Sequence, residues 1–282
     1  MIRRSVGWWS ALLIGGCVLA CAEDDGQPTD PSRTPFGHQA PPVWTLQLDL
    51  SDLPAPDSAA AGDGTCYGRT GRLSFLADKF VQHRVSLAAT TFAACLRGPS
   101  EFSGDVTWTW KASGGRGDST WSATLRAFVV SPDSVIWWGR VVGTSEHFQD
   151  FFCMYGYCDG EATQGFWQFY HPEFPDRQVR LIESRWIRQP GVSELRTARF
   201  DVFGTTSDSA PEGVGEWAIY ALGDSVATLR YHDKSDLEDD RELRVERDLR
   251  TGAGRWTQQG YPGDTEACCW GPRPERADQD CP

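Results

Sequence analysis

The sequence lacks the short motifs by which most metal sites and hydrolases are recognised. It has no C-x-x-C or H-x-x-x-H pair to hold zinc, no G-x-S-x-G turn to present a nucleophilic serine, and only five histidines. The EF-hand calcium pattern is missing as well. Carboxylates crowd at residues 233–240, where a solvated loop is the simpler interpretation. We therefore expect no catalytic residue, no metal and no cofactor.

Positive charge is scarce relative to negative charge. Lys and Arg total 27 while Asp and Glu total 39, so the formal net charge is −12. Removal of an N-terminal leader would take away Arg3 and Arg4 but no acid, and −12 would become −14. Such a surface repels phosphate groups, so nucleic acid is not an expected partner. The 40% of apolar residues suffices for a core.

No apolar run is long enough to cross a bilayer as a helix. The longest, Val6–Leu19, falls short of the ~20 residues required and includes Ser10, Gly15 and Gly16. Arg3 and Arg4 precede it, which gives the segment the charged and apolar regions of a cleavable export signal.

The export signal ends in Val18-Leu19-Ala20-Cys21. This ending resembles the lipobox of bacterial lipoproteins, in which a small residue precedes a cysteine that is diacylated on sulfur and becomes the new N-terminus. The resemblance implies that residues 1–20 are a signal peptide and that Cys21 becomes a diacylglycerol cysteine carrying chains such as palmitate. A second box ends at Cys17, but apolar residues follow it, whereas charged residues follow Cys21 closely.

Lipidation at Cys21 implies a location in the bacterial cell envelope. Acyl chains contribute about 0.8 kcal/mol per buried methylene, so two or three of them hold a protein in a leaflet permanently. An aspartate after the lipidated cysteine resembles an inner-membrane retention signal, and Ala22 stands there instead. We expect an outer-membrane lipoprotein that faces the periplasm or the cell surface and meets the membrane through its lipid anchor.

Residues 21–42 form the expected tether, because five prolines stand there among polar residues. Such a composition cannot bury enough apolar surface to order itself, and its prolines favour extended geometry. The remaining residues, 43–282, are expected to form a single β-rich domain.

The fold class predicted for this domain is α+β and mainly β. Val43–Leu50 alternates apolar and polar residues and predicts a first strand. Residues 72–96 have helical spacing and no Gly or Pro, so they predict a short helical segment, broken near His83. Short turns between the later segments predict an antiparallel meander, curled into an open barrel or a sandwich. The predicted strands cover residues 106–111, 120–130, 134–142, 164–170, 178–188, 195–203, 216–222, 226–231, 242–248 and 255–259.

An internal repeat is predicted within residues 165–260. Residues 165–170 read G-F-W-Q-F-Y, and residues 215–220, fifty positions later, read G-E-W-A-I-Y. Each copy is followed by E-L-R-x-x-R, and a third opening occurs at Gly254-Arg255-Trp256. We expect a duplicated unit of three or four strands, in which each glycine opens a tight turn or admits another backbone closely.

The region from about residue 72 onward resembles uncharacterised secreted bacterial lipoproteins. The shared features are an alanine-rich helical stretch, a W-x-W strand such as Trp108–Trp110, G-x-W-x-x-Y strands, and a C-terminal end like Cys269-Trp270 followed by Asp280-Cys281-Pro282. This resemblance implies an architecture and no activity.

After processing at Cys21, seven cysteines remain, and in an oxidising envelope they are expected to form disulfides. A short loop is expected to be closed by Cys153 and Cys158, and Cys66 is expected to pair with Cys95. One of Cys268 and Cys269 would pair with Cys281. Because seven is odd, at least one thiol stays unpaired.

The tryptophans are the remaining lead to a function. Trp108, Trp110, Trp167 and Trp217 would stack on sugar faces if they lined one exposed surface, and they would be inert if they filled the core. We expect a non-enzymatic module that binds or scaffolds a protein or a glycan. The alternatives are a β-barrel carrier of an apolar ligand and, less favoured, a hydrolase without a recognisable motif.

Overall fold

The computed structural model divides into Met1–Asp30 and Pro31–Pro282, and all residues that it describes belong to the second unit. The signal peptide, Cys21 and the tether up to residue 38 therefore lie outside the described residues. The described residues are 39–54, 65–103, 106–116, 119–143, 150–170, 179–189, 195–204, 214–236, 239–259, 265–272 and 277–281. No helix among them is both long and apolar enough to span a bilayer.

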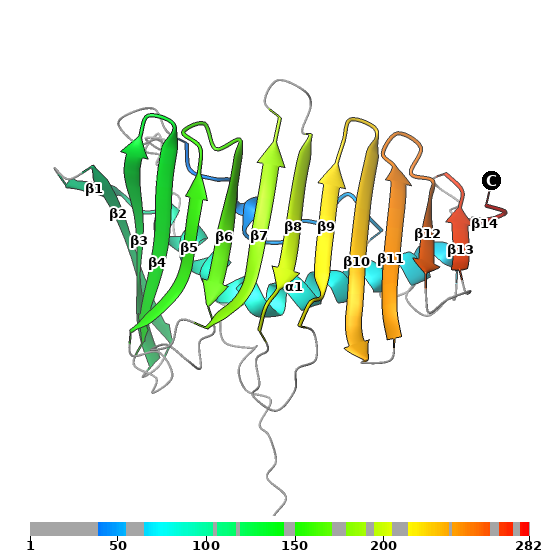
Figure 1. The fold of residues 1–282 in the computed structure, drawn as a ribbon, viewed down its shortest axis with the longest axis horizontal. Helices are drawn as coiled ribbons and strands as arrows, with labels where there is room; N and C mark the ends of the chain where they lie inside the picture. The colour runs from blue at the N-terminus through cyan, green and yellow to red at the C-terminus, as the bar shows by residue number, and fades with distance from the viewer. Residues whose placement is uncertain are drawn as a thin grey trace, which may run out of the picture. The chain divides into compact units, whose positions relative to one another are not determined.

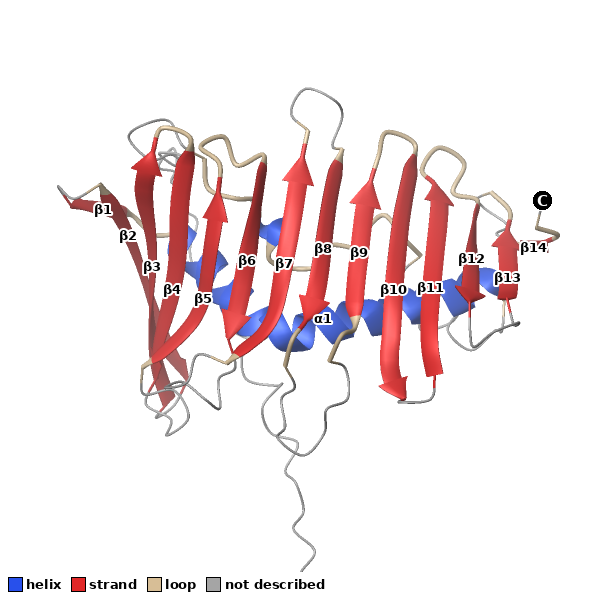
Figure 2. Ribbon diagram, viewed as in Figure 1, coloured by secondary structure: helices blue, strands red, loops and turns tan. Residues whose placement is uncertain are grey.

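Fourteen strands form one antiparallel sheet in which spatial order equals chain order, so the predicted meander is confirmed (Figure 1). The sheet is open, and a helix lies on one face of it where a sandwich would place a second sheet (Figure 2). The strands are β1 (Ser100–Ser103), β2 (Thr107–Arg116), β3 (Ser119–Ser131), β4 (Ser134–Gly143), β5 (Phe151–Cys158), β6 (Gln164–Tyr170), β7 (Arg180–Arg188), β8 (Arg196–Val202), β9 (Trp217–Leu222), β10 (Val226–Asp236), β11 (Asp239–Asp248), β12 (Gly254–Gln259), β13 (Thr265–Trp270) and β14 (Asp278–Gln279).

The helix α1 (Cys66–Leu96) is 31 residues long and runs across the strands on the face that we call the inner face (Figure 1). Thr65 caps it, since its hydroxyl accepts a hydrogen bond from the Gly68 N–H at 3.1 Å. Val81, Val85 and Phe92 are fully buried against the sheet, at the spacing that one helical face requires. The predicted break near His83 is wrong, because α1 is continuous there.

The strands bury alternate side chains beneath α1. On β4, Val135, Trp137 and Val141 are buried on the inner face, whereas Ile136 and Trp138 lie on the opposite, outer face. The period of two follows from the pleat of a strand. The core of the protein is therefore the single layer between α1 and the sheet.

The segment 39–54 also covers the inner face, and the strand predicted at Val43–Leu50 is wrong. A 3-10 helix, η1 (Val43–Thr45), opens this stretch, and irregular backbone follows it. Leu46, Leu48 and Leu53 are buried in the core. The segment imitates a strand because Leu46 and Leu48, two positions apart, are both buried against the sheet.

Polar contacts attach this segment to the sheet at both ends. Thr45 accepts a hydrogen bond from Trp167 Nε1 at 3.0 Å through its hydroxyl and one from Ser184 at 3.0 Å through its carbonyl. Further along, the Asp52 carbonyl accepts from Arg247 at 2.6 Å and its carboxylate accepts from Tyr220 at 3.2 Å. These contacts satisfy polar groups that would otherwise be buried without partners.

Two disulfides connect the C-terminal strands to the rest of the fold. Cys66, at the start of α1, bonds to Cys268 on β13, and Cys269 bonds to Cys281. The second bond agrees with the pairing expected from the sequence. The expected pairing of Cys66 with Cys95 is wrong, because these residues stand at opposite ends of α1, about 44 Å apart at 1.5 Å per helical residue.

The loop predicted between Cys153 and Cys158 is also wrong, because both residues lie within β5, a strand that the sequence did not predict. Five steps along a strand separate them by about 17 Å, well beyond the reach of a disulfide. Together with Cys95 they are unpaired and buried. The C-terminal strands β13 and β14 and the edge strand β1 were not predicted from the sequence either.

The repeated sequence falls on strands at intervals of three. Its tryptophans are Trp167 on β6, Trp217 on β9 and Trp256 on β12. Residues paired directly across a sheet share a face, and the register places Ala218, not Trp217, in line with Trp167. Trp167 and Trp256 are accordingly buried on the inner face, whereas Trp217 lies half-buried on the outer face. Successive copies are alike in sequence, but their tryptophans lie on alternate faces of the sheet.

Two glycines of the repeat allow close contact, as the sequence predicted. A Cβ on Gly165 would lie 2.2 Å from the Tyr157 carbonyl oxygen and 2.8 Å from the Trp186 ring. A Cβ on Gly254 would lie 2.3 Å from the Glu246 carbonyl oxygen and 2.4 Å from the Trp270 ring. Each glycine thus makes room for a tryptophan of the next strand.

We expect the Gly165→Ala substitution to lower the free energy of unfolding by about 3 kcal/mol, since a methyl group cannot fit against the backbone without moving β5 or β7. Gly271→Ala is the matched control, because its nearest atoms are 3.6 Å away. Urea unfolding of both variants measures the difference. Equal stability of the two variants would contradict this account of the repeat.

Candidate functional site

The structure separates the four tryptophans that the sequence grouped as a possible surface. Trp110 and Trp167 are each 1% exposed in the core. Trp108 is half-buried on the same face as Trp110, near the β1 edge. Trp217 alone among the four lies on the outer face. The surface therefore cannot be formed by these four side chains together, and the outer face must be built from others.

The outer face carries an aromatic patch over β4, β5 and β6. Its members are half-buried or exposed, and neighbouring rings are in contact. Between ring centroids, Phe152 lies 6.3 Å from Trp138 and 5.3 Å from Tyr170. Phe166 lies 6.1 Å from Tyr155 and 6.2 Å from Tyr157. The patch is extended on β3 by the Arg126 guanidinium, 4.7 Å from the Trp138 centroid. Each ring shields part of its neighbour from water.

The same face carries an arginine row over β7 to β11. The strand register places Arg185 opposite Arg199, and Arg230 opposite Arg244, with Ile219 between the two pairs. The row continues the aromatic patch, because Phe166 stands opposite Arg185. Neighbouring like charges in a sheet repel, so the row requires carboxylates beside it.

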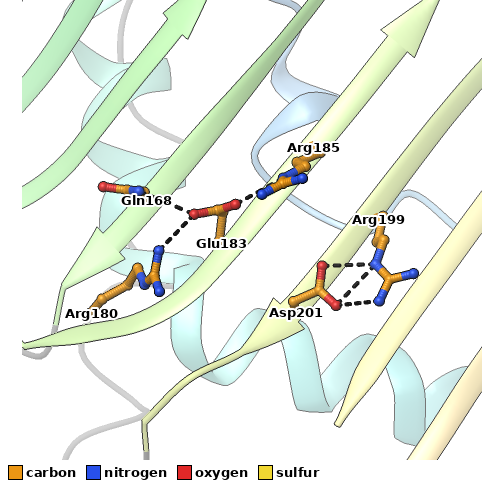
Figure 3. A network of polar contacts seen from close by, with 6 residues as sticks. All are labelled: Gln168, Arg180, Glu183, Arg185, Arg199 and Asp201. Atoms are coloured by element: carbon orange, nitrogen blue, oxygen red, sulfur yellow. Dashed lines mark hydrogen bonds and ion pairs between the residues drawn. The ribbon is translucent and has the colours of Figure 1, made fainter. Parts of the chain in front are cut away.

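Those carboxylates stand two residues away on the same strand or diagonally across the next strand. Figure 3 shows the first of these groups, in which Glu183 accepts hydrogen bonds from Gln168 at 3.1 Å and from Arg180 and Arg185 at 2.9 Å each. In the second, Arg199 donates hydrogen bonds to the Asp201 carboxylate from Nε at 2.8 Å and from Nη2 at 2.6 Å (Figure 3). Such charge-assisted hydrogen bonds hold the three guanidiniums in place, and the contact of Arg199 is forked.

The remaining arginines are paired in the same manner. Arg230 contacts Glu242 at 2.7 Å, and Glu246 accepts from both Arg244 and Arg255. Burial by itself would raise the pKa of the Glu246 carboxyl, but the hydrogen bond from Arg255 and the charge of Arg244 outweigh burial and lower that pKa. Glu246 is therefore ionised at neutral pH.

Trp217 joins the two halves of the arginine row. The guanidiniums of Arg199 and Arg230 each lie 5.3 Å from its centroid, and the ring of His232 stacks on it at 5.3 Å and 11°. Cations near an indole face are attracted by its electron density. Trp217 thus provides an aromatic surface within the charged part of the outer face.

The unpaired cysteines do not form a reactive site. Burial raises the pKa of Cys95 to about 11 and the pKa of Cys153 and Cys158 to about 12, so all three remain thiols at neutral pH. Across the part of the chain that the structure describes, no three His, Cys, Asp or Glu side chains are grouped to hold a metal ion.

The aromatic patch and the arginine row were not predicted from the sequence. Their members alternate with core residues, so the chain shows them as every second position of ordinary strands. The signal that was available is Trp137-Trp138, where two adjacent large side chains on one strand must point to opposite faces. Comparison of this chain with protein-family models, curated proteins and solved structures finds no match.

Proposed function

We propose that this protein is an envelope lipoprotein whose β-rich unit binds a partner across the outer face of its sheet. Acyl chains on Cys21 anchor it in the outer membrane, and the proline-rich residues 21–42 serve as its tether. The proposal rests on one observation above all. No described helix or strand covers the outer face of the sheet (Figure 2). Aromatic side chains nevertheless lie there over three neighbouring strands, β4, β5 and β6.

The packing of the inner face favours this function over that of a carrier. A carrier of an apolar ligand needs an interior that the ligand can enter. Here Trp110, Trp137 and Trp167 fill the layer beneath α1, with Phe92 in contact with two of them at 5.8 and 5.5 Å between centroids. The outer face therefore supports the proposed function better than the core does.

Lipidation at Cys21 is tested by mass spectrometry of the intact protein purified from membranes. We expect a mature chain that begins at residue 21 and carries two or three acyl chains, and a Cys21→Ala variant without them. Cys17→Ala is the control and should remain acylated. An acylated Cys21→Ala protein, or an unmodified wild type, would contradict the proposed anchor.

Binding by the outer face is tested by photo-cross-linking in intact cells. Tyr157 and Phe75 are 37% and 40% exposed, the first on the aromatic patch and the second on α1. With p-benzoylphenylalanine at either position, we expect adducts of higher mass from position 157 and few from position 75. Equal yields at the two positions, or none at either, would contradict a partner on the outer face.

A further inference from the structure

We infer that the partner of the outer face is a linear polysaccharide whose sugar rings carry carboxylate groups. This inference rests on the proposed function and adds the chemistry of the ligand. It follows from three properties of the face: the sign of the charge that reaches solvent, the length of the row, and the flat rings beside it.

The ion-paired side chains on this face carry more positive than negative charge, although the whole chain carries −12. The ion pairs on the outer face of β7 to β12 join six arginines to four carboxylates, which leaves an excess of two positive charges. The arginines are Arg180, Arg185, Arg199, Arg230, Arg244 and Arg255, and the carboxylates are Glu183, Asp201, Glu242 and Glu246.

The excess is concentrated where two arginines share one carboxylate. The Arg185 side chain is 72% exposed while Glu183, which it shares with Arg180, is 6% exposed. Arg244 is likewise 52% exposed over Glu246, which is 20% exposed. The acids thus lie close to the sheet and the guanidiniums lie above them, so an approaching ligand meets positive charge.

The guanidiniums suit carboxylates in particular. Arg185 donates to Glu183 through Nε, which leaves its two Nη groups for a ligand. A planar guanidinium binds a carboxylate through two parallel hydrogen bonds. The ligand that fits this row therefore carries several carboxylates, spaced along its length.

The row requires an extended ligand. Together with the adjoining aromatic patch, the row forms a continuous line from Tyr157 on β5 through Phe166, Arg185 and Arg199 to Arg244 on β11, which is six strand spacings or about 29 Å. A small molecule would occupy a fraction of this length. A linear polymer that crosses the strands would contact the whole row.

The rings of the aromatic patch favour sugars over peptide as that polymer. The C–H groups of a pyranose ring are attracted to the electron-rich face of an aromatic ring. Tyr157 is 37% exposed, and its ring lies 6.2 Å from that of Phe166 at 23°. An extended peptide binds preferentially to the edge of a sheet, where backbone groups are free. The outer face offers side chains instead.

The test compares a two-arginine variant with a matched control. Arg185→Gln with Arg244→Gln removes the two most exposed of the six arginines. Glu183 keeps Arg180 and Glu246 keeps Arg255, so neither carboxylate is left unpaired. Arg69→Gln with Arg72→Gln removes the same charge from exposed positions on α1. Any effect of net charge alone is therefore equal in the two proteins.

The purified full-length protein, in neutral detergent, is titrated against alginate, polygalacturonate and hyaluronate. We expect binding to at least one of them, a Kd roughly tenfold or more weaker in the outer-face variant, and little change in the control, as lost charge-assisted hydrogen bonds predict. Methyl-esterified polygalacturonate has no charge, and it should bind the wild-type protein at least as weakly as polygalacturonate binds the outer-face variant.

Three results would overturn the inference: binding to none of the three polysaccharides, equal weakening in both variants, or tighter binding to poly-L-glutamate than to any polysaccharide. The cross-link at position 157 separates this failure from that of the proposed function. If the cross-link forms while no carboxylated polysaccharide binds, the face has a partner of different chemistry. If the cross-link is also absent, the outer face is not a binding surface.

Discussion

The packing of one helix across one face of a fourteen-stranded sheet is the constraint on which the rest of this structure depends. A sheet has two faces, and a single α1 with the segment 39–54 can cover only one of them. All the large buried side chains, Trp137 and Phe92 among them, gather on that face. The other face must therefore be made compatible with water by its own side chains.

The outer face meets this requirement in two ways. Over β4 to β6, aromatic rings such as Phe152 and Tyr170 cover part of one another's surface. Over β7 to β12, arginines pair with carboxylates that lie beneath them, as Arg185 does with Glu183. Both arrangements leave flat rings and guanidinium groups accessible over several neighbouring strands. An uncovered face that solves its solvation problem in this manner is also well suited to bind an extended, anionic chain of sugars.

The sequence predicted the meander well because strand alternation and turn residues are local signals. It predicted the disulfide partner of Cys66 wrongly, because that partner is 202 residues away. It also could not assign a face to Trp217, because that face depends on the register of β6 to β9. The segment Val43–Leu50 has the period of a strand yet packs as irregular backbone. The outer-face site was missed because no single stretch of sequence contains it; the register brings Arg185 and Arg244 into one row.

The assignment of faces is tested most directly by hydroxyl-radical footprinting of Trp137 and Trp138, which are neighbours in sequence and have the same chemistry. Trp137 is fully buried beneath α1, and Trp138 is half-buried on the outer face beside Arg126. We expect Trp138 to be oxidised many times faster than Trp137 in the folded protein and both to react alike after unfolding in urea. Equal rates in the folded protein would contradict the account of one covered and one open face.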